Sequence, residues 1–440
     1  MLAMVLAVSA CLSSANLTGG NDEAPSIVSG EAGAACTADL QADVGNCGAC
    51  GKVCANQANA YGVCKAGACA VGCNTGFGDC DGKPETGCEA MLATDSNHCG
   101  ACGKSCGGAR CVAGQCQPLA FGEVPGYVSA VTQDATAIYY AFSAGGNYAI
   151  GRLAKSGATG HTEVVTGIVD GIASLAVTDT EVYWTRASVS PTAMPPDGAI
   201  RRASKTTPSV ADAPWIGALA LGYSDATVIA DGSAFYAQSD RAASPLSTLS
   251  RAALTGTTSV VVAQGLKGTI NTLGVDGGIA YYYASGDNTG VGRGLYRCPT
   301  SGCGSASVLV PGVPANSYLS LLSFNGPHVY FSTNRAVARM KKDGTEYGVL
   351  ATTENNYGSV VAYAADTTRL YWIERMFGGG PGADVNSMFT CPIASCKDGR
   401  QQVLVSGAPR YVLVDDTAFY ILAQTNTGAG TATTVLRVVK

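Results

Sequence analysis

Histidine and charged side chains are scarce in this chain. Its 440 residues include 3 histidines, and only 13% of the residues are aspartate, glutamate, lysine or arginine. No HExxH, GxSxG, Walker-type or strand-linked GxGxxG motif occurs, so the common signatures of metalloproteases, serine hydrolases and nucleotide-binding enzymes are missing. The formal net charge is −5 and lysine and arginine form no run, which argues against binding to nucleic acid or to anionic lipid headgroups.

The scarcity of histidine also limits catalysis by a nucleophile and a base, because that base is usually histidine. Only His161 and His328 follow residue 117, and we expect both to be exposed and no residue to be catalytic. The alternative is an extracytoplasmic propeller enzyme, a lyase or hydrolase acting at a central channel. Its candidate carboxylates are Asp170, Glu354, Glu374 and Asp384.

Long apolar segments are missing as well. The run "MLAMVLAVSAC" is too short to span a bilayer and ends in small residues, as an export signal does. Val8-Ser9-Ala10-Cys11 is similar to a bacterial lipobox, so we expect lipidation of Cys11, although the signal has no basic start. A plain signal with an incidental cysteine is the alternative. Residues 12–35 are small and polar, and they predict a flexible tether that spans roughly 25–30 Å.

Cysteine is concentrated in one segment, since 14 of the 19 cysteines lie in residues 36–116. The segment is duplicated with an offset of 52, because "NCGACGKVC" (46–54) matches "HCGACGKSC" (98–106). We expect three disulfides in each six-cysteine copy and a seventh between Cys73 and Cys80. Spacing alone leaves the connectivity open. Such a scaffold persists only outside a reducing cytosol, which predicts an extracytoplasmic protein.

Zinc is the competing interpretation of the CxxC pairs, but six cysteines in each copy without paired histidines favour disulfides. His98 stands where the first copy has Asn46 and is expected to be a turn residue. The acidic segment 78–89 does not have the ligand spacing of an EF-hand. We therefore expect no metal and no cofactor. The expected disulfide cysteines, with two short pairs near the C-terminus, are Cys36, Cys47, Cys50, Cys54, Cys64, Cys69, Cys73, Cys80, Cys88, Cys99, Cys102, Cys106, Cys111, Cys116, Cys298, Cys303, Cys391 and Cys396.

From residue 117 onward, short alternating segments with a central tyrosine recur. Successive tyrosines are 44, 53, 45, 49, 41 and 49 residues apart, at Tyr139, Tyr183, Tyr236, Tyr281, Tyr330, Tyr371 and Tyr420. A period near 45 residues with about four strands in each unit is typical of propeller blades. The chain is thus predicted to be all-β, with a seven-bladed β-propeller over 117–440 after a small disulfide-rich module. In the second unit we expect strands at 172–177, 181–186, 198–205 and 208–213.

The tyrosine motif recurs because a single blade cannot bury its own faces, so each interface between blades needs large side chains. The last unit is one strand short, whereas a spare strand-like segment, 118–124, precedes the first unit. We expect this N-terminal strand to complete the last blade, because that pairing removes an exposed sheet edge.

"VYWTR" (182–186) and "LYWIE" (370–374) resemble the YWTD-type β-propellers and related bacterial secreted propellers. The Asp of YWTD is replaced by Arg186, and seven units stand where the receptor propellers have six. The "NCGACGKxC" and "DCDGKPETGCE" segments resemble cysteine-rich repeats of predicted surface lipoproteins from myxobacteria and related bacteria. This resemblance implies an outer-membrane-anchored or cell-surface lipoprotein, or else a secreted one, and supplies no catalytic residue.

Long loops between second and third strands, and the connections between blades, share one face of a propeller, and function concentrates on such loops. We expect this face to bind a protein or glycan of the cell envelope or of the extracellular space, in a monomer that meets the membrane only through its lipid anchor and does not bind nucleic acid. The candidate residues on it are Arg186, Trp215, Asp240, Arg241, Asp287, Tyr318, Tyr357, Glu374 and Asp384.

Overall fold

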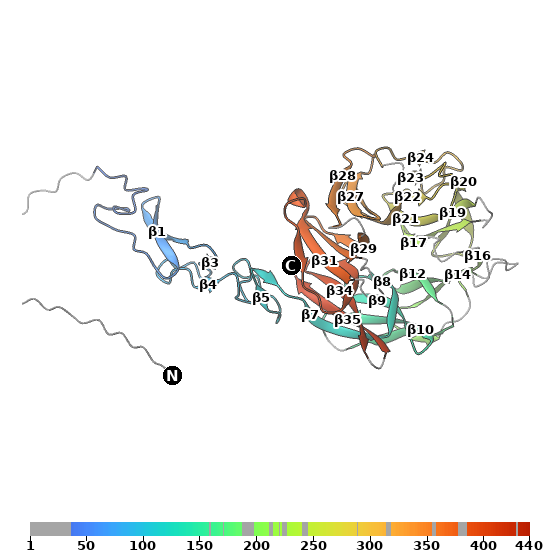
Figure 1. The fold of residues 1–440 in the computed structure, drawn as a ribbon, viewed down its shortest axis with the longest axis horizontal. Coiled ribbons are helices and arrows are strands. Elements are labelled where there is room, and N and C mark those ends of the chain that lie inside the picture. Colours follow the sequence, from blue (N-terminus) through green and yellow to red (C-terminus); the bar gives the residue numbers. More distant parts are fainter. Residues whose placement is uncertain are drawn as a thin grey trace, which may run out of the picture.

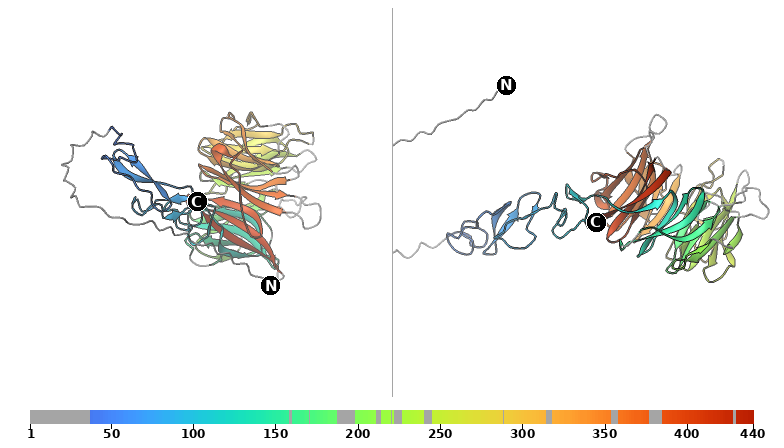
Figure 2. Two further views of the ribbon diagram at one scale, coloured as in Figure 1. Left: turned by 60° about the vertical axis from the view of Figure 1, so that its left-hand side comes forward. Right: turned by 90° about the horizontal axis from the view of Figure 1, so that it is seen from below.

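The structure is a computed structural model. It describes residues 37–440 except 158–159, 170, 187–197, 211–213, 220, 222–226, 240–244, 288, 314–317, 354–357, 377–384 and 428–429. The described part is all-β apart from one 3-10 helix, η1 (Ile393–Ser395). Seven sheets surround a central axis, and a narrow module extends from one side of this ring (Figures 1 and 2). Across the described residues, no helix has both the length and the apolarity that a membrane crossing requires.

The seven sheets are the blades of a β-propeller, and each has four antiparallel strands, to which the sheet of blade 1 adds a short fifth strand in parallel. Blade 1 consists of β8 (Tyr127–Gln133), β9 (Ala137–Ala144), β10 (Asn147–Ala154) and β11 (Thr162–Ile168). Blade 2 consists of β12 (Ile172–Val177), β13 (Glu181–Arg186), β14 (Gly198–Ser204) and β16 (Ile216–Leu219). Blade 3 consists of β17 (Thr227–Ala230), β18 (Ser233–Ser239), β19 (Leu246–Ala253) and β20 (Ser259–Lys267). Blades 4 and 5 are β21 (Ile270–Asp276), β22 (Ile279–Ala284), β23 (Gly294–Pro299) and β24 (Val308–Leu309); and β25 (Leu319–Asn325), β26 (His328–Thr333), β27 (Ala336–Lys341) and β28 (Gly348–Thr352). Blades 6 and 7 are β29 (Gly358–Ala365), β30 (Arg369–Met376), β31 (Val385–Pro392) and β32 (Gln401–Val403); and β33 (Ala408–Val414), β34 (Ala418–Thr427), β35 (Gly430–Val439) and β7 (Leu119–Pro125).

The fourth strand of blade 2 differs from the expectation. The segment expected to supply it contains β15 (Ser209–Val210), which pairs in parallel with β11 of blade 1. The fourth strand is β16, which pairs with β14. The segment after β14 therefore first reaches back to the neighbouring blade before it completes its own.

The second strand of each blade carries the recurrent tyrosine, and all seven of these tyrosines are at most 3% exposed. Alternation along β13 explains how both faces of a blade are filled. Val182 and Trp184 belong to an apolar cluster shared with blade 1, whereas Tyr183 on the opposite face meets Trp215 edge to face at 5.5 Å. The repeated motif thus supplies the packing between blades.

The strand before the first blade lies in the last one. β7 pairs with β35 in antiparallel register, with Val124 opposite Thr433 and Ala120 opposite Leu436. A register shift at Phe121 breaks the simple alternation of the strand. Phe121 contacts the Tyr420 ring at 5.6 Å between centroids, whereas Leu119 is largely exposed.

Among the described residues, an aspartate and a lysine at the same two repeat positions form an ion pair across four of the seven interfaces between blades. The aspartate lies in the turn between the first and second strands of one blade, five residues before the central tyrosine. The lysine lies at the end of the third strand of the next blade. The pairs are Asp134–Lys205, Asp276–Lys342, Asp366–Lys440 (2.7 Å) and Asp415–Lys155 (3.0 Å).

The cysteine-rich module contains three short hairpins: β1 (Ala60–Lys65) with β2 (Ala68–Cys73), β3 (Phe77–Gly78) with β4 (Ala90–Met91), and β5 (Cys111–Val112) with β6 (Gln115–Cys116). The duplication in sequence is also a duplication in structure. Cys47 N–H donates to the carbonyl of Lys52, and Cys99 N–H donates to that of Lys104 at the same 2.9 Å. His98 is a turn residue as expected, because its Nδ1 accepts from Gly103 N–H where Asn46 accepts from Gly51 N–H.

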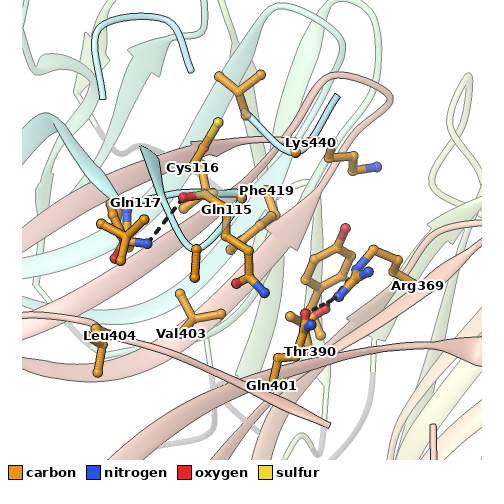
Figure 3. A pocket seen from close by; sticks show the side chains of 18 of the residues that line it. Gln115, Cys116, Gln117, Arg369, Thr390, Gln401, Val403, Leu404, Phe419 and Lys440 are labelled. Atoms are coloured by element: carbon orange, nitrogen blue, oxygen red, sulfur yellow. Dashed lines mark hydrogen bonds between the residues drawn. The ribbon is translucent and has the colours of Figure 1, made fainter. Parts of the chain in front are cut away.

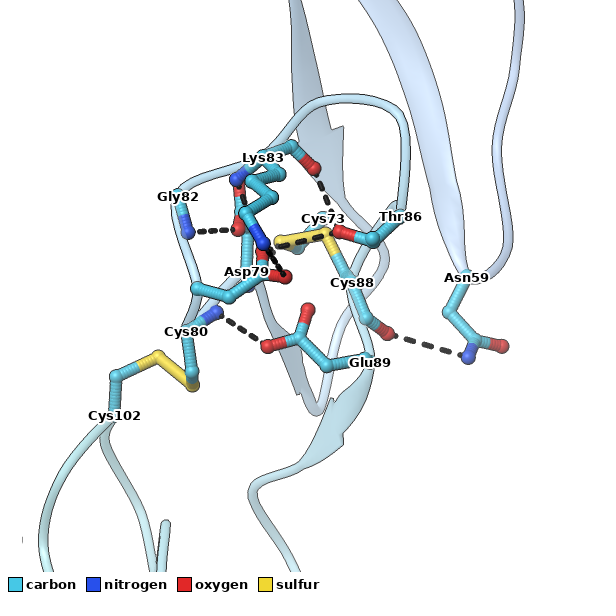
Figure 4. Close-up of a disulfide and its surroundings, with 11 residues drawn as sticks. Asn59, Cys73, Asp79, Cys80, Gly82, Lys83, Thr86, Cys88, Glu89 and Cys102 are labelled. Atoms are coloured by element: carbon cyan, nitrogen blue, oxygen red, sulfur yellow. Dashed lines mark hydrogen bonds and ion pairs between the residues drawn. A yellow bond between two sulfur atoms is a disulfide. The ribbon is translucent and has the colours of Figure 1, made fainter.

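The disulfides of the second copy differ from the expectation. Both copies share two equivalent bridges, Cys47–Cys64 and Cys54–Cys69 in the first and Cys99–Cys111 and Cys106–Cys116 in the second. Cys73 and Cys80 do not bond to each other. They bond to Cys88 and Cys102, the remaining cysteines of the second copy, and so connect the two copies in series (Figure 4).

The other cysteines that were predicted to form disulfides or to carry a lipid lie in the propeller, in the first copy and near the N-terminus. Cys298–Cys303 and Cys391–Cys396 are local bridges in blades 4 and 6, as expected. Cys50 also participates in a disulfide. Cys11 and Cys36 lie outside the described residues.

Candidate binding site

Five of the nine residues predicted for the binding face belong to the described part of the chain: Arg186, Trp215, Asp287, Tyr318 and Glu374. The other four, Asp240, Arg241, Tyr357 and Asp384, lie outside it, as do the channel candidates Asp170 and Glu354. Arg186 is half-buried at the end of β13, opposite Ile172.

Glu374 is not a binding-face residue. Its side chain is fully buried within blade 6, where Oε1 accepts from Trp372 Nε1 at 2.7 Å and lies 3.0 Å from Arg400 Nη1. The Arg400 guanidinium also lies 3.6 Å from the centre of the Phe389 ring. A buried carboxylate needs such a partner because an unpaired charge there is costly. We therefore correct the assignment: Glu374 is part of a structural ion pair.

Trp215 is also misplaced by the sequence analysis. It directly precedes β16, and its ring packs against Tyr183 and lies 5.2 Å from the guanidinium carbon of Arg202. This aromatic side chain belongs to the packing of blade 2 and does not belong to the connections between blades.

Asp287 lies in the loop between the second and third strands of blade 4. Its carboxylate accepts hydrogen bonds from Thr289 and from Val291 N–H, and it forms a 3.2 Å ion pair with Lys267 at the end of blade 3. The hydrogen bond from the Thr289 side chain is the largest of the effects that lower the pKa of Asp287 to about 2. The carboxylate is therefore ionised at neutral pH and held in one orientation.

Tyr318 lies beside this loop, in the connection from blade 4 to blade 5. Its side chain is 48% exposed, and the Arg293 guanidinium carbon stands 4.4 Å from the ring centre. Arg293 is itself fixed, because its Nε donates to the carbonyl of Ser285 at 3.0 Å. We call Lys267, Asp287, Arg293 and Tyr318 the blade 4–5 cluster. It combines an exposed aromatic ring with both signs of charge on a rigid support.

The histidines that could have acted as bases have structural partners. His161 is half-buried, not exposed as expected, and its Nδ1 lies 2.6 Å from the Tyr140 hydroxyl. His328 is also half-buried and meets the Tyr330 ring edge to face. Burial first, and then the nearby Arg339 and Lys341, lower the pKa of His328.

Within the described residues, all groups of three or more potential metal ligands lie in the cysteine-rich module. Three of the four contain disulfide cysteines, and the fourth is Asp79, Asp81 and Glu89, of which Figure 4 labels Asp79 and Glu89. These carboxylates already accept hydrogen bonds from the backbone, as Asp79 does from Gly82 N–H and Glu89 from Cys80 N–H. The acidic segment is thus held together by its own hydrogen bonds.

Comparisons with known proteins add only a distant likeness in fold. No protein-family profile and no curated protein sequence matches this chain. Prolyl oligopeptidase B from Galerina marginata is 14% identical over 71% of this chain and 48% of its own, with a TM-score of 0.49. This chain therefore spans about half of that protein. The β-propeller domain of the Trilobed protease from Pyrococcus furiosus is 9% identical over 62% and 84% of the two chains, with a TM-score of 0.43. The structure of YCF48 bound to D1 peptide gives 12% identity, 72% and 94% coverage and a TM-score of 0.45.

Sequence reasoning missed Lys267 and Arg293, which complete the blade 4–5 cluster. Arg293 ends the long loop between β22 and β23, so its place in a loop between second and third strands was an available signal. Lys267 lies at the end of β20 in the preceding blade, and no local pattern marks it as a partner of Asp287.

Proposed function

We propose that this protein is a non-enzymatic, extracytoplasmic binding protein whose propeller presents its loop face to a protein or glycan ligand. The blade 4–5 cluster is the observation that carries this proposal. Tyrosine and arginine are enriched among the residues that dominate binding energy, and here both are held in place before any ligand arrives. Eight disulfides among the described residues support an oxidising location.

Attachment to the cell surface through a lipid on Cys11 belongs to the same proposal, with outer-membrane anchoring as the specific form. The polar residues 12–35 then hold the folded part away from the bilayer. Replacing Cys11 with Ser should shift the protein from the membrane fraction to the soluble extracytoplasmic fraction. A variant that remains in the membrane fraction contradicts the anchor but leaves the binding face untouched.

Binding is tested with an immobilised panel of purified cell-wall glycan fragments and envelope proteins. The full chain should bind one class of these probes, and the double variant Arg293→Ala, Tyr318→Ala should bind it at least tenfold more weakly. Lys341→Ala is the matched control, because Lys341 is a charged residue at the opposite end of a blade and forms a surface ion pair with Glu346. Equal binding by the double variant, or turnover of a probe by the purified protein, would overturn the proposal.

A further inference from the structure

A cleft of about 770 Å³ lies between the cysteine-rich module and the propeller (Figure 3). The second cysteine-rich copy forms one wall with Lys104, Gln115 and Gln117, and blades 6 and 7 form the other. This volume falls within the usual range for ligand sites, and such sites occur preferentially where two domains meet. No sequence motif drew attention to this cleft, because its walls come from two unrelated repeats.

The walls of the cleft are fixed relative to each other. One apolar cluster contains Cys106, Ala109 and Cys116 of the module together with Phe419 and Val438 of blade 7. Two disulfides, Cys99–Cys111 and Cys106–Cys116, hold the module side in shape. The cleft is therefore a preformed feature, so a ligand would not have to order it.

Positive charge dominates the cleft. Its charged lining residues are Lys104, Arg369, Lys440 and Asp366, and the last two neutralise each other in a 2.7 Å ion pair. Arg369 donates to the neutral partners Thr390 (3.2 Å) and Gln401 (3.0 Å), as Figure 3 shows. Among the described residues, no carboxylate lies within ion-pair distance of the Lys104 or Arg369 side chain. Two uncompensated cations favour an acidic ligand.

The propeller side of the cleft includes an unpaired sheet edge. β32 is the outermost strand of blade 6, and its residues Gln401, Gln402 and Val403 line the cleft, followed by the highly exposed Leu404. Gln115 reaches from the module side toward this strand (Figure 3), and its side-chain amide makes no hydrogen bond within the described residues. Edge strands and amide groups both match the backbone of an extended peptide.

A saccharide fits this lining less well. Glycans are commonly held against an exposed aromatic face, because the apolar face of a sugar ring packs there. The aromatic residues of the cleft, Tyr371 and Phe419, are 1% and 6% exposed and pack against each other at 4.6 Å. Exposed apolar surface instead comes from Val112 and Leu404, which suit aliphatic side chains.

We propose that this cleft binds an acidic polypeptide segment in extended conformation, which pairs with the edge of β32 and places carboxylates near Lys104 and Arg369. This site is separate from the blade 4–5 cluster. Loss of one site should therefore leave the other intact, and Arg293→Ala, Tyr318→Ala should bind such a peptide as the unmodified protein does.

The test uses the full chain and a displayed library of random decapeptides. Recovered peptides should be enriched in aspartate and glutamate alternating with aliphatic residues. Lys104→Glu should weaken their binding at least tenfold and Lys104→Gln about threefold. The matched control is Lys52→Glu, because Lys52 is the equivalent residue of the first copy, occupies the same turn and does not line the cleft. This control should change the Kd less than twofold.

Strand pairing has its own signature. Methylation of single backbone nitrogens in a recovered peptide should reduce binding at every second position, because alternate amides point toward β32. A library without acidic enrichment, equal effects of Lys104→Glu and Lys52→Glu, or methylation without this period overturns the proposal. Lys104-dependent binding of acidic oligogalacturonate in place of any peptide would assign the cleft to a glycan and also contradict it.

Discussion

The interface between blades 1 and 2 contains a largely buried ion pair, whereas the equivalent positions between blades 2 and 3, both among the described residues, carry no charge. Asp134 and Lys205 face each other in the first, and Lys205 lies 5.1 Å from the centre of the Tyr139 ring. Thr178 and Leu254 occupy the same two positions in the second. Both strand ends nevertheless make the same backbone contact within their own blade: Lys205 N–H donates to the carbonyl of Thr180, and Leu254 N–H donates to the carbonyl of Gly232.

The same two positions can be compared at the other five interfaces. The backbone contact occurs in all seven blades, with Lys155, Lys205, Leu254, Thr300, Lys342, Ile393 and Lys440 as donors. The turn aspartate and the lysine occur together at four interfaces, and Asn325 faces the Ile393 position without either charge. At the remaining interface Asp231 has Thr300 in the lysine position and accepts from Gly278 N–H instead. A half-buried charge without a partner is unfavourable, which explains why each of the four lysines at this position faces an aspartate, whereas the unpaired Asp231 is exposed.

The largest effect is expected where the ring closes between blades 7 and 1. Val124 of β7 is 1% exposed and packs in a cluster shared by these two blades. Val124→Asp should place an unpaired carboxylate there, remove β7 from the edge of β35 and cost roughly 4 kcal/mol or more. Urea unfolding should lose its cooperative transition, and light scattering should show association through the exposed edge. Glu123→Ala, an exposed change on the same strand, should behave as the unmodified protein.

A smaller loss is expected when one member of an ion pair is removed. Lys205→Met should leave Asp134 facing an apolar side chain and lower the free energy of unfolding by about 2 kcal/mol, since Asp134 is partly exposed and keeps its bonds to Thr136 and Ala137. Adding Asp134→Asn should restore at least half of that loss. A double variant less stable than Lys205→Met alone would show that the unpaired charge of Asp134 is not the cause of the lost stability.

The same comparison shows what the sequence could predict. Tyrosine spacing predicted the seven blades because each interface needs the same buried ring, and copy-to-copy alignment predicted the role of His98. The ion pairs escaped notice because each joins a turn of one blade to a strand end of the next. Glu374 was misassigned because its partner Arg400 lies in a separate segment, just before β32, and Trp215 because its segment carries no alternation. Disulfide connectivity and the cleft both depend on how whole repeats pack.

The third effect is a pH dependence. Burial raises the pKa of Asp415 and of Asp366, but hydrogen bonds from Lys155 and Lys440, and from the turn N–H groups, outweigh it and lower both pKa values to about 2 from 3.8. Because the folded-state pKa values are depressed, their stabilisation is complete above about pH 4 to 5 and is lost as the pH falls from 3.8 to 2. Each pair should contribute roughly 1 to 2 kcal/mol over this window. Urea unfolding of Asp415→Asn from pH 5 to pH 2.5 should show a correspondingly weaker pH dependence.

The smallest effect is expected when an ion pair is transferred to the interface that lacks one. Thr178 accepts a hydrogen bond from Glu181 N–H, which an aspartate in its place can also accept, and the backbone contact of Leu254 is already present. Arg202, however, donates to the carbonyl of Leu254 at 3.0 Å, so a lysine at this position must share space with an existing cation. Thr178→Asp and Leu254→Lys should therefore each destabilise the protein, while the double variant should recover only about 0.5 kcal/mol of favourable coupling in a double-mutant cycle by urea unfolding. Zero coupling would show that two compatible positions are not sufficient, and that Arg202, which already contacts Leu254, prevents a lysine there from pairing.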